Sequence, residues 1–177
     1  MSDTPTLAQR CAAIELLVVD VDGVLTDGRI VYTAEGVELK AFHVRDGSGL
    51  TFWQKLGKQV AILSGRKSKT VDVRAQELGI RLVRQGAADK LAAFRQMLVQ
   101  LGLRVEQAAA VGDDLPDLPV LRAAGLAVAV ADACPEVRAV AHHVTVTKGG
   151  RGAVREVIEL ILKHQGRWDG VVNTYAS

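Results

Sequence analysis

Residues 15–28 read ELLVVDVDGVLTDG, and this stretch decides the fold. The apolar run at 16–19 is typical of a strand that is buried on both faces of a parallel sheet. Two carboxylates follow the run, Asp20 and Asp22, and Gly23 allows the chain to turn. We therefore expect a strand that presents two carboxylates at the carboxyl edge of a sheet, where open parallel sheets bind their ligands.

The rest of the chain repeats the pattern of this strand. Apolar runs alternate with amphipathic stretches, which is typical of strands that alternate with helices. Predicted strands span 15–19, 59–63, 81–84, 108–111, 126–130 and 143–147, and predicted helices span 47–56, 68–78, 89–101, 117–124, 135–141 and 152–165. A left-handed C-capping residue is expected after four of these helices, at Gly57, Gly79, Gly102 and Gly125. The fold class indicated is α/β, a three-layer, Rossmann-like parallel sheet.

One segment, GRIVYTAEGVELKAFHV at 28–44, interrupts the alternation. Strand-like runs on both sides of residues 34–36 predict a β-hairpin that is inserted after the first strand. Several of its side chains are too apolar to be left in water, namely Ile30, Tyr32, Val37, Leu39 and Phe42. The hairpin is therefore expected to mediate assembly with other subunits.

The length of the chain leaves room for one domain and little else. With 177 residues, 49% apolar and 24% charged, we expect a single domain, 1–177, with a mobile tail at 166–177. Only 43 positions lie between Asp20 and Ser64, and 22 lie between Lys90 and Asp113. Neither interval can hold a separate cap domain, so the site is expected to be open unless a neighbouring subunit closes it.

Composition argues against several classes of partner. The net charge is +2 and the basic residues are scattered, which disfavours nucleic acid and anionic membranes. No apolar stretch approaches the roughly 20 residues of a membrane helix, and the start of the chain has no export-signal core. Cys11 and Cys134 lack metal-site spacing and are expected to be reduced thiols. We expect a cytoplasmic protein.

Polar residues follow several of the predicted strands at the same edge of the sheet. They are Asp20 and Asp22 after the first strand, Ser64 after the second, Lys90 after the third, and Asp113, Asp114 and Asp117 after the fourth. Crowded carboxylates repel one another, so such a cluster persists when a cation lies among them. Oxygen ligands without His or Cys favour a hard ion, and Mg²⁺ beside a phosphate fits best.

Two carboxylates at this spacing can divide the work of group transfer, because one can attack while the other delivers and removes a proton. Taken singly, each motif also has a structural interpretation. Residues 20–23 can form an Asx-type turn, Ser64 can cap a helix, and Lys90 can be a solvated side chain. The motifs together, in this order at successive strand ends, favour the catalytic interpretation.

The motifs DVDGVLTDG, LSGRK, Lys90 and GDDLPD resemble the four signature motifs of the haloacid dehalogenase-like phosphohydrolases. Within that superfamily, the segments FHVRDG and KGGRGAVREV resemble the 3-deoxy-D-manno-octulosonate 8-phosphate phosphatase family, and the likeness covers about residues 14–165. The resemblance implies that Asp20 is the nucleophile and that Asp22 is the general acid and base. It implies that Ser64 and Lys90 hold the transferring phosphoryl group.

The same resemblance implies a Mg²⁺ site and a set of substrate contacts. Mg²⁺ would be held by Asp20, the backbone carbonyl of Asp22, and Asp113, with Asp114 nearby. The implied substrate contacts are Asp22, His43, Val44, Arg45, Asp46, Gly47, Arg66, Arg74, Lys90 and Arg151. Three positions depart from the family pattern: His43 stands for Asn, Thr51 for a basic residue, and Ser64 for Thr. The glycine-rich loop around Arg151 either reaches the substrate carboxylate or leads into a helix.

The activity that the resemblance implies is that of a phosphoric monoester hydrolase, a Mg²⁺-dependent phosphatase. It would hydrolyse 3-deoxy-D-manno-octulosonate 8-phosphate through an aspartyl-phosphate, in lipopolysaccharide biosynthesis, as a homotetramer built through the hairpin. One alternative is a phosphatase for a nine-carbon 2-keto-3-deoxy sugar acid phosphate. Others are a non-catalytic oligomerisation or regulatory module and a signalling receiver domain. Asp22 disfavours a receiver, because a second carboxylate hastens loss of the phosphoryl group.

Overall fold

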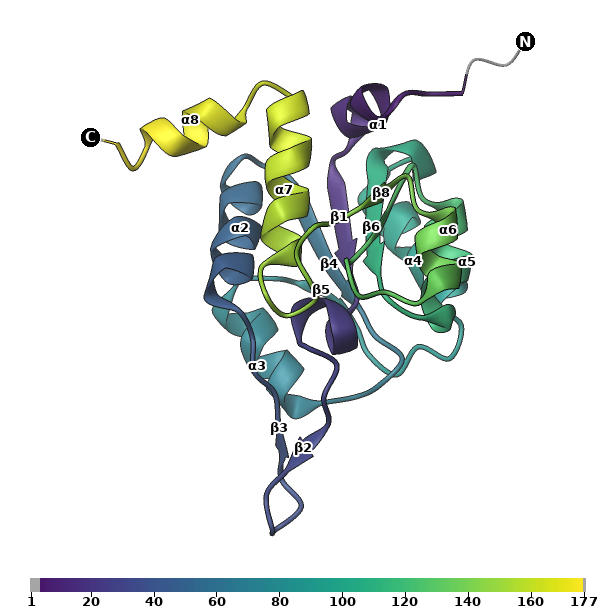
Figure 1. Ribbon diagram of the computed structural model, residues 1–177, viewed down its shortest axis with the longest axis vertical. Helices are drawn as coiled ribbons and strands as arrows, with labels where there is room; N and C mark the ends of the chain where they lie inside the picture. The colour runs from purple at the N-terminus through teal and green to yellow at the C-terminus, as the bar shows by residue number, and fades with distance from the viewer. Residues whose placement is uncertain (1–3, 177) are drawn as a thin grey trace.

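The computed structural model describes residues 4–176 and is built on a six-stranded parallel sheet (Figure 1). In spatial order the strands are β5 (Leu82–Arg84), β4 (Gln59–Leu63), β1 (Leu16–Val19), β6 (Ala108–Gly112), β7 (Leu126–Ala129) and β8 (His143–Val144). β1 is paired along its whole length with both β4 and β6, and its four residues are buried. The strand that leads to Asp20 is therefore held on both sides by backbone hydrogen bonds.

Helices cover both faces of the sheet and give three layers (Figure 1). On one face lie α2 (Val44–Lys55), α3 (Lys69–Glu77) and α7 (Ala153–His164), and on the other lie α4 (Lys90–Leu101), α5 (Leu118–Ala123) and α6 (Pro135–Val140). Large buried side chains on both faces, including Trp53, Phe94 and Ile158, fill the space against the strands. The predicted three-layer α/β fold is confirmed, and within residues 4–176 no cap domain covers the sheet.

Two helices lie where the sequence pattern predicts none. α1 (Leu7–Ala13) begins with a capping box in which the side chains and backbone amides of Thr6 and Gln9 exchange hydrogen bonds. α8 (Trp168–Asn173) lies in the segment expected to be a mobile tail, so these residues are helical where no helix was predicted. The guanidinium of Arg155 lies 4.9 Å from the Trp168 ring and ties α8 to α7, a contact that local periodicity does not reveal.

The last strand is shorter than predicted, because β8 ends at Val144 rather than at residue 147. Beyond it, the backbone amides of Val146 and Thr147 donate to the carboxylate of Glu156 at 2.8 and 2.9 Å. A side chain of α7 thus binds two backbone amides just beyond the end of β8. Among the helices in residues 4–176, none is long and apolar enough to cross a bilayer.

The expected left-handed glycines are confirmed at three positions and wrong at the fourth. Gly57, Gly79 and Gly102 have φ values of 79°, 67° and 65°. Gly125 does not share this conformation. A Cβ at Gly125 would lie 2.4 Å from the backbone oxygen of Glu106, so this position requires glycine for space.

The predicted hairpin projects from the end of the molecule (Figure 1), with β2 (Val31–Tyr32) paired antiparallel to β3 (Glu38–Leu39). Its regular pairing is limited to two residues on each strand. The apolar side chains of Val31, Tyr32 and Leu39 are 45–57% exposed. Phe42 instead packs against the core. The ribbon therefore carries an apolar surface that the rest of the described chain leaves uncovered.

The two kinds of glycine predict different costs of substitution. We expect Gly125→Ala to lower the free energy of unfolding by about 2–3 kcal/mol, because the new methyl group would meet rigid backbone. Gly57→Ala is the matched control: its Cβ would meet open space, so only the left-handed conformation costs, about 1 kcal/mol. Urea unfolding followed by circular dichroism measures both, and equal losses would contradict the steric explanation.

Candidate active site

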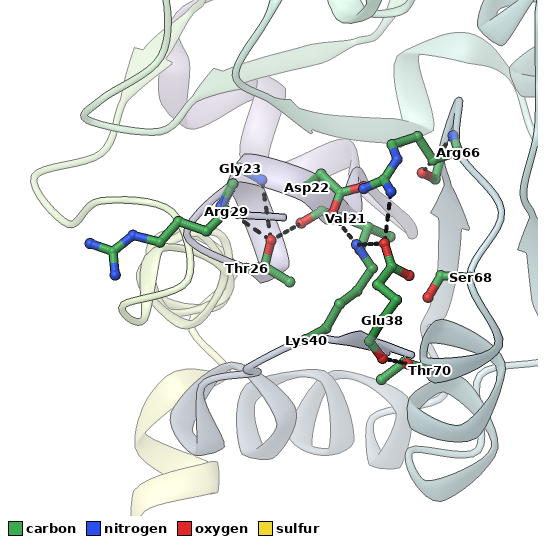
Figure 2. A network of polar contacts seen from close by, with 12 residues as sticks. Val21, Asp22, Gly23, Thr26, Arg29, Glu38, Lys40, Arg66, Ser68 and Thr70 are labelled. Atoms are coloured by element: carbon green, nitrogen blue, oxygen red, sulfur yellow. Dashed lines mark hydrogen bonds and ion pairs between the residues drawn. The ribbon is translucent and has the colours of Figure 1, made fainter. Parts of the chain in front are cut away.

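The site begins where β1 ends. After Asp20, residues Val21–Leu25 form one wide helical turn in which Gly23 has a φ of 95°. Figure 2 shows the Thr26 hydroxyl inside this turn, where it donates to the Val21 carbonyl at 3.3 Å and accepts from the Gly23 amide at 3.4 Å. A Cβ at Gly23 would lie 2.0 Å from an oxygen of Asp113. Glycine is therefore required here both for the turn and for close approach of β6.

A buried ammonium lies at the centre of the site. Lys90, the first residue of α4, places Nζ 2.9 Å from Asp20 Oδ1 and 2.7 Å from Asp117 Oδ1. Burial acts to lower the pKa of Lys90, but the two carboxylates outweigh it and the pKa is raised. Lys90 is therefore a fixed positive charge beside Asp20.

Asp117 connects this cation to the loop after β6. Its second oxygen, Oδ2, accepts the backbone amides of Asp113 at 3.0 Å and Asp114 at 3.4 Å. A Cβ at Gly112 would lie 2.6 Å from the Cβ of Asp117, so glycine at the end of β6 lets the two segments meet. Asp117 thus sets the position of both Lys90 and the loop that bears Asp113.

Three carboxylates converge on one point, since oxygens of Asp20, Asp113 and Asp117 lie within 4.8 Å of one another. Burial, with the negative charge of Asp117, raises the pKa of Asp20 to about 6. Burial, with the charges of Asp20, Asp117 and Asp114, raises the pKa of Asp113 to about 7. The Oδ1 atom of Asp113 is buried without a hydrogen-bond partner. Lys90 compensates only part of the negative charge of these three carboxylates, and an all-oxygen cluster of this kind fits a hard divalent cation.

Asp22 lies in different surroundings from Asp20. One oxygen of Asp22 forms an ion pair with Lys40 of the hairpin, and the other lies 3.3 Å from an Arg66 nitrogen (Figure 2). Glu38 joins the same network, 2.7 Å from Arg66 and 3.6 Å from Lys40. The two carboxylates that follow β1 are therefore held by separate sets of cations.

Ser64 stands at the end of β4, where its buried hydroxyl accepts the backbone amide of Arg66 at 3.3 Å. It opens on a cleft of about 310 Å³ together with the acidic cluster. The cleft is lined by Asp20, Asp22, Gly28, Ser64, Gly65, Arg66, Lys90, Asp113, Asp114, Pro116 and Asp117. The structure thus brings all the predicted catalytic and metal-ligating residues to one opening at the carboxyl edge of the sheet.

Comparison with known proteins agrees with this geometry. The haloacid dehalogenase-like hydrolase family matches residues 73–158. The chain is 51% identical over 162 residues to the 3-deoxy-D-manno-octulosonate 8-phosphate phosphatase of Yersinia pestis, covering 92% of this chain and 87% of the relative. The corresponding phosphatase of Escherichia coli K12 is also 51% identical, over 88% of this chain and 83% of its own length. The chain belongs to the 3-deoxy-D-manno-octulosonate 8-phosphate phosphatase family.

Solved structures support membership in this phosphatase family. The phosphatase of Moraxella catarrhalis, crystallised with magnesium, phosphate and 3-deoxy-D-manno-octulosonate (KDO), superposes with a TM-score of 0.93 at 46% identity. The superposition covers 95% of this chain and 97% of that one. A cobalt-bound phosphatase of Haemophilus influenzae gives a TM-score of 0.88 at 44% identity, covering 90% of this chain and 94% of that one.

The family's expected substrate segment, residues 43–47, lies outside the cleft of this chain. Val44 and Arg45 are exposed at the start of α2, and His43 lies beside the core with a buried, unpartnered Nδ1. Asp46 is only 1% exposed, and its oxygens accept the backbone amides of Gly152 at 3.2 Å and Arg155 at 2.8 Å. Asp46 thus ties α2 to the start of α7, and its contact with substrate stays a prediction.

Gly47 and Arg74, two further expected substrate contacts, also lie outside the cleft and contact other parts of the chain. A Cβ at Gly47 would lie 2.3 Å from a guanidinium nitrogen of Arg74, so glycine lets that side chain pass. Arg74 forms an ion pair with Glu77 at 3.1 Å and lies 5.8 Å from the Phe42 ring. Thr51, at the position where a basic residue was expected, donates to the Gly47 carbonyl within α2.

The glycine-rich loop that carries Arg151 packs on the turn formed by Val21–Leu25. Gly150 donates to the Val24 carbonyl at 2.8 Å, and a Cβ at Gly149 would lie 1.7 Å from the Gly23 oxygen. The side chain of Arg151 points to solvent and approaches Asp27 at 3.5 Å. The loop therefore supports the turn and leads into α7, and the contact of Arg151 with the substrate carboxylate stays a prediction.

Sequence reasoning placed Asp117 in the acidic cluster but did not foresee its contact with Lys90, and it gave no role to Lys40 and Glu38. A signal existed for Asp117, because it follows Asp113 by four positions inside the GDDLPD motif. The alternation in Glu38-Leu39-Lys40 also placed both charges on one face of a strand. What the sequence did not show is that this face turns toward Asp22.

The acidic cluster predicts a conflict between stability and metal binding. In metal-free protein at pH 7.5, Asp113→Asn should raise the melting temperature by about 2–4 °C, because it removes a buried charge that faces two other carboxylates. The gain should shrink as the pH falls from 7 toward 4: the carboxyl group in the folded protein takes up a proton first, and wild-type stability recovers. The same variant should lose the stabilisation that added Mg²⁺ gives the wild type, as measured by calorimetry with and without chelator.

Proposed function

We propose that this protein is a Mg²⁺-dependent phosphatase that hydrolyses 3-deoxy-D-manno-octulosonate 8-phosphate to 3-deoxy-D-manno-octulosonate and phosphate. The observation that carries the proposal is the separate holding of two carboxylates in one cleft. Asp20 is paired with the buried ammonium of Lys90, and Asp22 with Lys40 and Arg66. The substrate is inferred from relatives that are named as phosphatases of this compound and that match about nine-tenths of the chain.

In the first step, a carboxylate oxygen of Asp20 attacks the phosphorus atom. The bond between phosphorus and the sugar oxygen breaks, and Asp22 gives its proton to that oxygen as the sugar leaves. Lys90 holds the attacking carboxylate in place and offsets its charge, while Ser64 and Lys90 receive the transferring oxygens. The product of this step is an aspartyl-phosphate on Asp20.

In the second step, Asp22 is a carboxylate and accepts a proton from a water molecule, which attacks the phosphorus atom. The bond between phosphorus and Asp20 breaks, so phosphate leaves and Asp20 returns as a carboxylate. Asp22 ends the cycle protonated and ready for the next sugar phosphate. The same residue therefore acts first as acid and then as base.

Mg²⁺ neutralises charge on the phosphoryl oxygens when it is bound. We propose that Asp20, the backbone carbonyl of Asp22, and Asp113 hold the ion, with Asp114 at its edge. The buried, unpartnered oxygen of Asp113 supports this assignment. Asp117 contributes to the cluster by orienting Lys90 and the Asp113 loop.

Two alternatives remain for the test to exclude. A nine-carbon 2-keto-3-deoxy sugar acid phosphate presents the same phosphate and carboxylate groups, so the two substrates must be compared directly. A non-catalytic module has no use for a buried cation that is shared between two carboxylates. The two cysteines are unpaired, in keeping with the reducing cytoplasm, where we propose that the enzyme serves lipopolysaccharide biosynthesis.

Asp20→Asn should reduce phosphate release from the eight-carbon substrate by at least about 10³-fold, because an amide cannot act as the nucleophile. The protein should keep its circular dichroism spectrum and its mass in solution. Phosphate release is measured with Mg²⁺ and with a chelator, which should abolish wild-type turnover. Substantial turnover by the variant would exclude Asp20 as the nucleophile, and faster wild-type turnover of the nine-carbon substrate would overturn the substrate assignment.

We also propose that the enzyme works as a homotetramer held together through the hairpin. The support is the exposed apolar side chains of Ile30, Val31, Tyr32, Val37 and Leu39 on a ribbon that the described chain leaves uncovered. The cleft beside it has no cap of its own, so a neighbouring subunit is the natural source of closure. Residues 43–45 and Arg151 do not line the cleft of one subunit, and we propose that they meet substrate only in the completed assembly.

Replacing two of these side chains should break the assembly. We expect Tyr32→Glu with Val37→Glu to give species smaller than the wild-type oligomer in light scattering, because buried carboxylates at the contact oppose association. Val99→Glu is the control, since this side chain is also exposed but lies on α4, away from the hairpin. An unchanged mass for the double variant would show that the hairpin does not hold the oligomer together.

A further inference from the structure

Residues 38–40, which are β3 and the residue after it, present their two faces to different surroundings. Glu38 and Lys40 are two positions apart on an extended chain, so their side chains point the same way. Figure 2 shows both reaching toward Asp22. Leu39, between them, is half exposed on the other face. One short strand thus joins an apolar outer surface to a carboxylate of the active site.

The side chain of Lys40 is 1% exposed, although the residue belongs to a projecting ribbon. Its ammonium is compensated by Asp22 in direct contact and by Glu38 at 3.6 Å. A buried ammonium keeps its partners close, because a lost partner leaves an uncompensated charge out of water. Lys40 therefore holds the oxygen of Asp22 that it contacts.

Glu38 orders the cations around Asp22. Its carboxylate lies 2.7 Å from Arg66, which in turn lies 3.3 Å from the other oxygen of Asp22. Its backbone carbonyl accepts the hydroxyl of Thr70, in the first turn of α3, at 3.5 Å. Asp22, Glu38, Lys40 and Arg66 thus form a closed network with two negative and two positive charges. The hairpin supplies one charge of each sign, on Glu38 and Lys40.

We propose that Lys40 is a positioning residue that holds Asp22 in the orientation required for proton transfer, so the hairpin takes part in the chemical step within its own subunit. The inference rests on the proposed function, in which Asp22 protonates the leaving oxygen. Proton transfer needs the donor within hydrogen-bond reach of that oxygen. Lys40 acts through Asp22 and not on the phosphorus atom.

A dependence on the leaving group distinguishes this role from a structural one. A sugar alkoxide needs a proton to depart, whereas nitrophenolate departs without one, so loss of the acid slows only the first kind of substrate. The value of kcat/KM reports the steps up to departure of the leaving group, before water attacks. A role that only supports the fold would lower kcat/KM for both kinds of substrate alike.

The experiment compares Lys40→Met with wild type on the eight-carbon sugar phosphate and on p-nitrophenyl phosphate. We expect kcat/KM to fall at least about tenfold on the sugar phosphate and less than about threefold on the aryl phosphate. Arg29→Met is the matched control, since Arg29 lies on the same hairpin but its 76% exposed side chain faces Asp27. Arg29→Met should leave both values unchanged, and equal losses by Lys40→Met on both substrates would overturn the proposal.

A double-mutant cycle shows whether Lys40 acts through Asp22. In an Asp22→Ala background, Lys40→Met should change kcat/KM on the sugar phosphate by less than about twofold. A full tenfold loss in that background would assign Lys40 to substrate binding and overturn the positioning role. If Lys40→Met does not fold, as judged by circular dichroism, Glu38→Gln is read in the same way.

These measurements distinguish a wrong substrate from a wrong role for Lys40. A wild-type protein that hydrolyses aryl phosphates but not the sugar phosphate overturns the substrate assignment. The role of Lys40 is then read from a series of substituted phenyl phosphates. The rate of Lys40→Met should fall more steeply than that of wild type as the leaving phenol becomes a weaker acid. Parallel slopes would overturn the positioning role.

Discussion

The ammonium of Lys90 is the charge on which the rest of the site depends. It lies between Asp20 and Asp117, and all three side chains are nearly buried. Asp117 passes this arrangement to the loop after β6 by accepting two of its backbone amides, which brings Asp113 against the turn at Gly23. Without a cation at this point, three carboxylates would face one another out of water. The sheet and its loops position the three carboxylates, and the positive charge of Lys90 reduces the repulsion between them.

A second cation, Lys40, pairs with the second carboxylate, Asp22. This pair shares no residue with the pair formed by Lys90 and Asp20. Lys90 begins a helix of the core, whereas Lys40 comes from a ribbon that projects from it. The proposed nucleophile, Asp20, is therefore held by a helix of the core, and the proposed acid and base, Asp22, by a side chain of the projecting hairpin. If the ribbon joins subunits, its outer face meets a neighbour while its inner face holds Asp22. Assembly and proton transfer would then share one short strand.

Much of this could be predicted from the sequence, and the misses have identifiable causes. β4 and the helix after β5 fell where their apolar periods indicated, because burial on one or both faces leaves a local pattern. α8 was missed because its anchor is Arg155, which precedes Trp168 by more than three helical turns of chain. β8 was overextended: the backbone amides of Val146 and Thr147, beyond its end, bind the side chain of Glu156 in α7.

By itself, the sequence determined that two carboxylates, a hydroxyl and an ammonium arrive at one edge of a parallel sheet. That information is local: each residue follows an apolar run whose direction and end are visible in the chain. Only the tertiary structure decided which charges pair. Lys90 meets Asp20 across 70 positions, Arg66 meets Asp22 across 44, and Lys40 meets Asp22 across 18. No periodic pattern encodes such contacts, because they depend on how strands and helices cross in space.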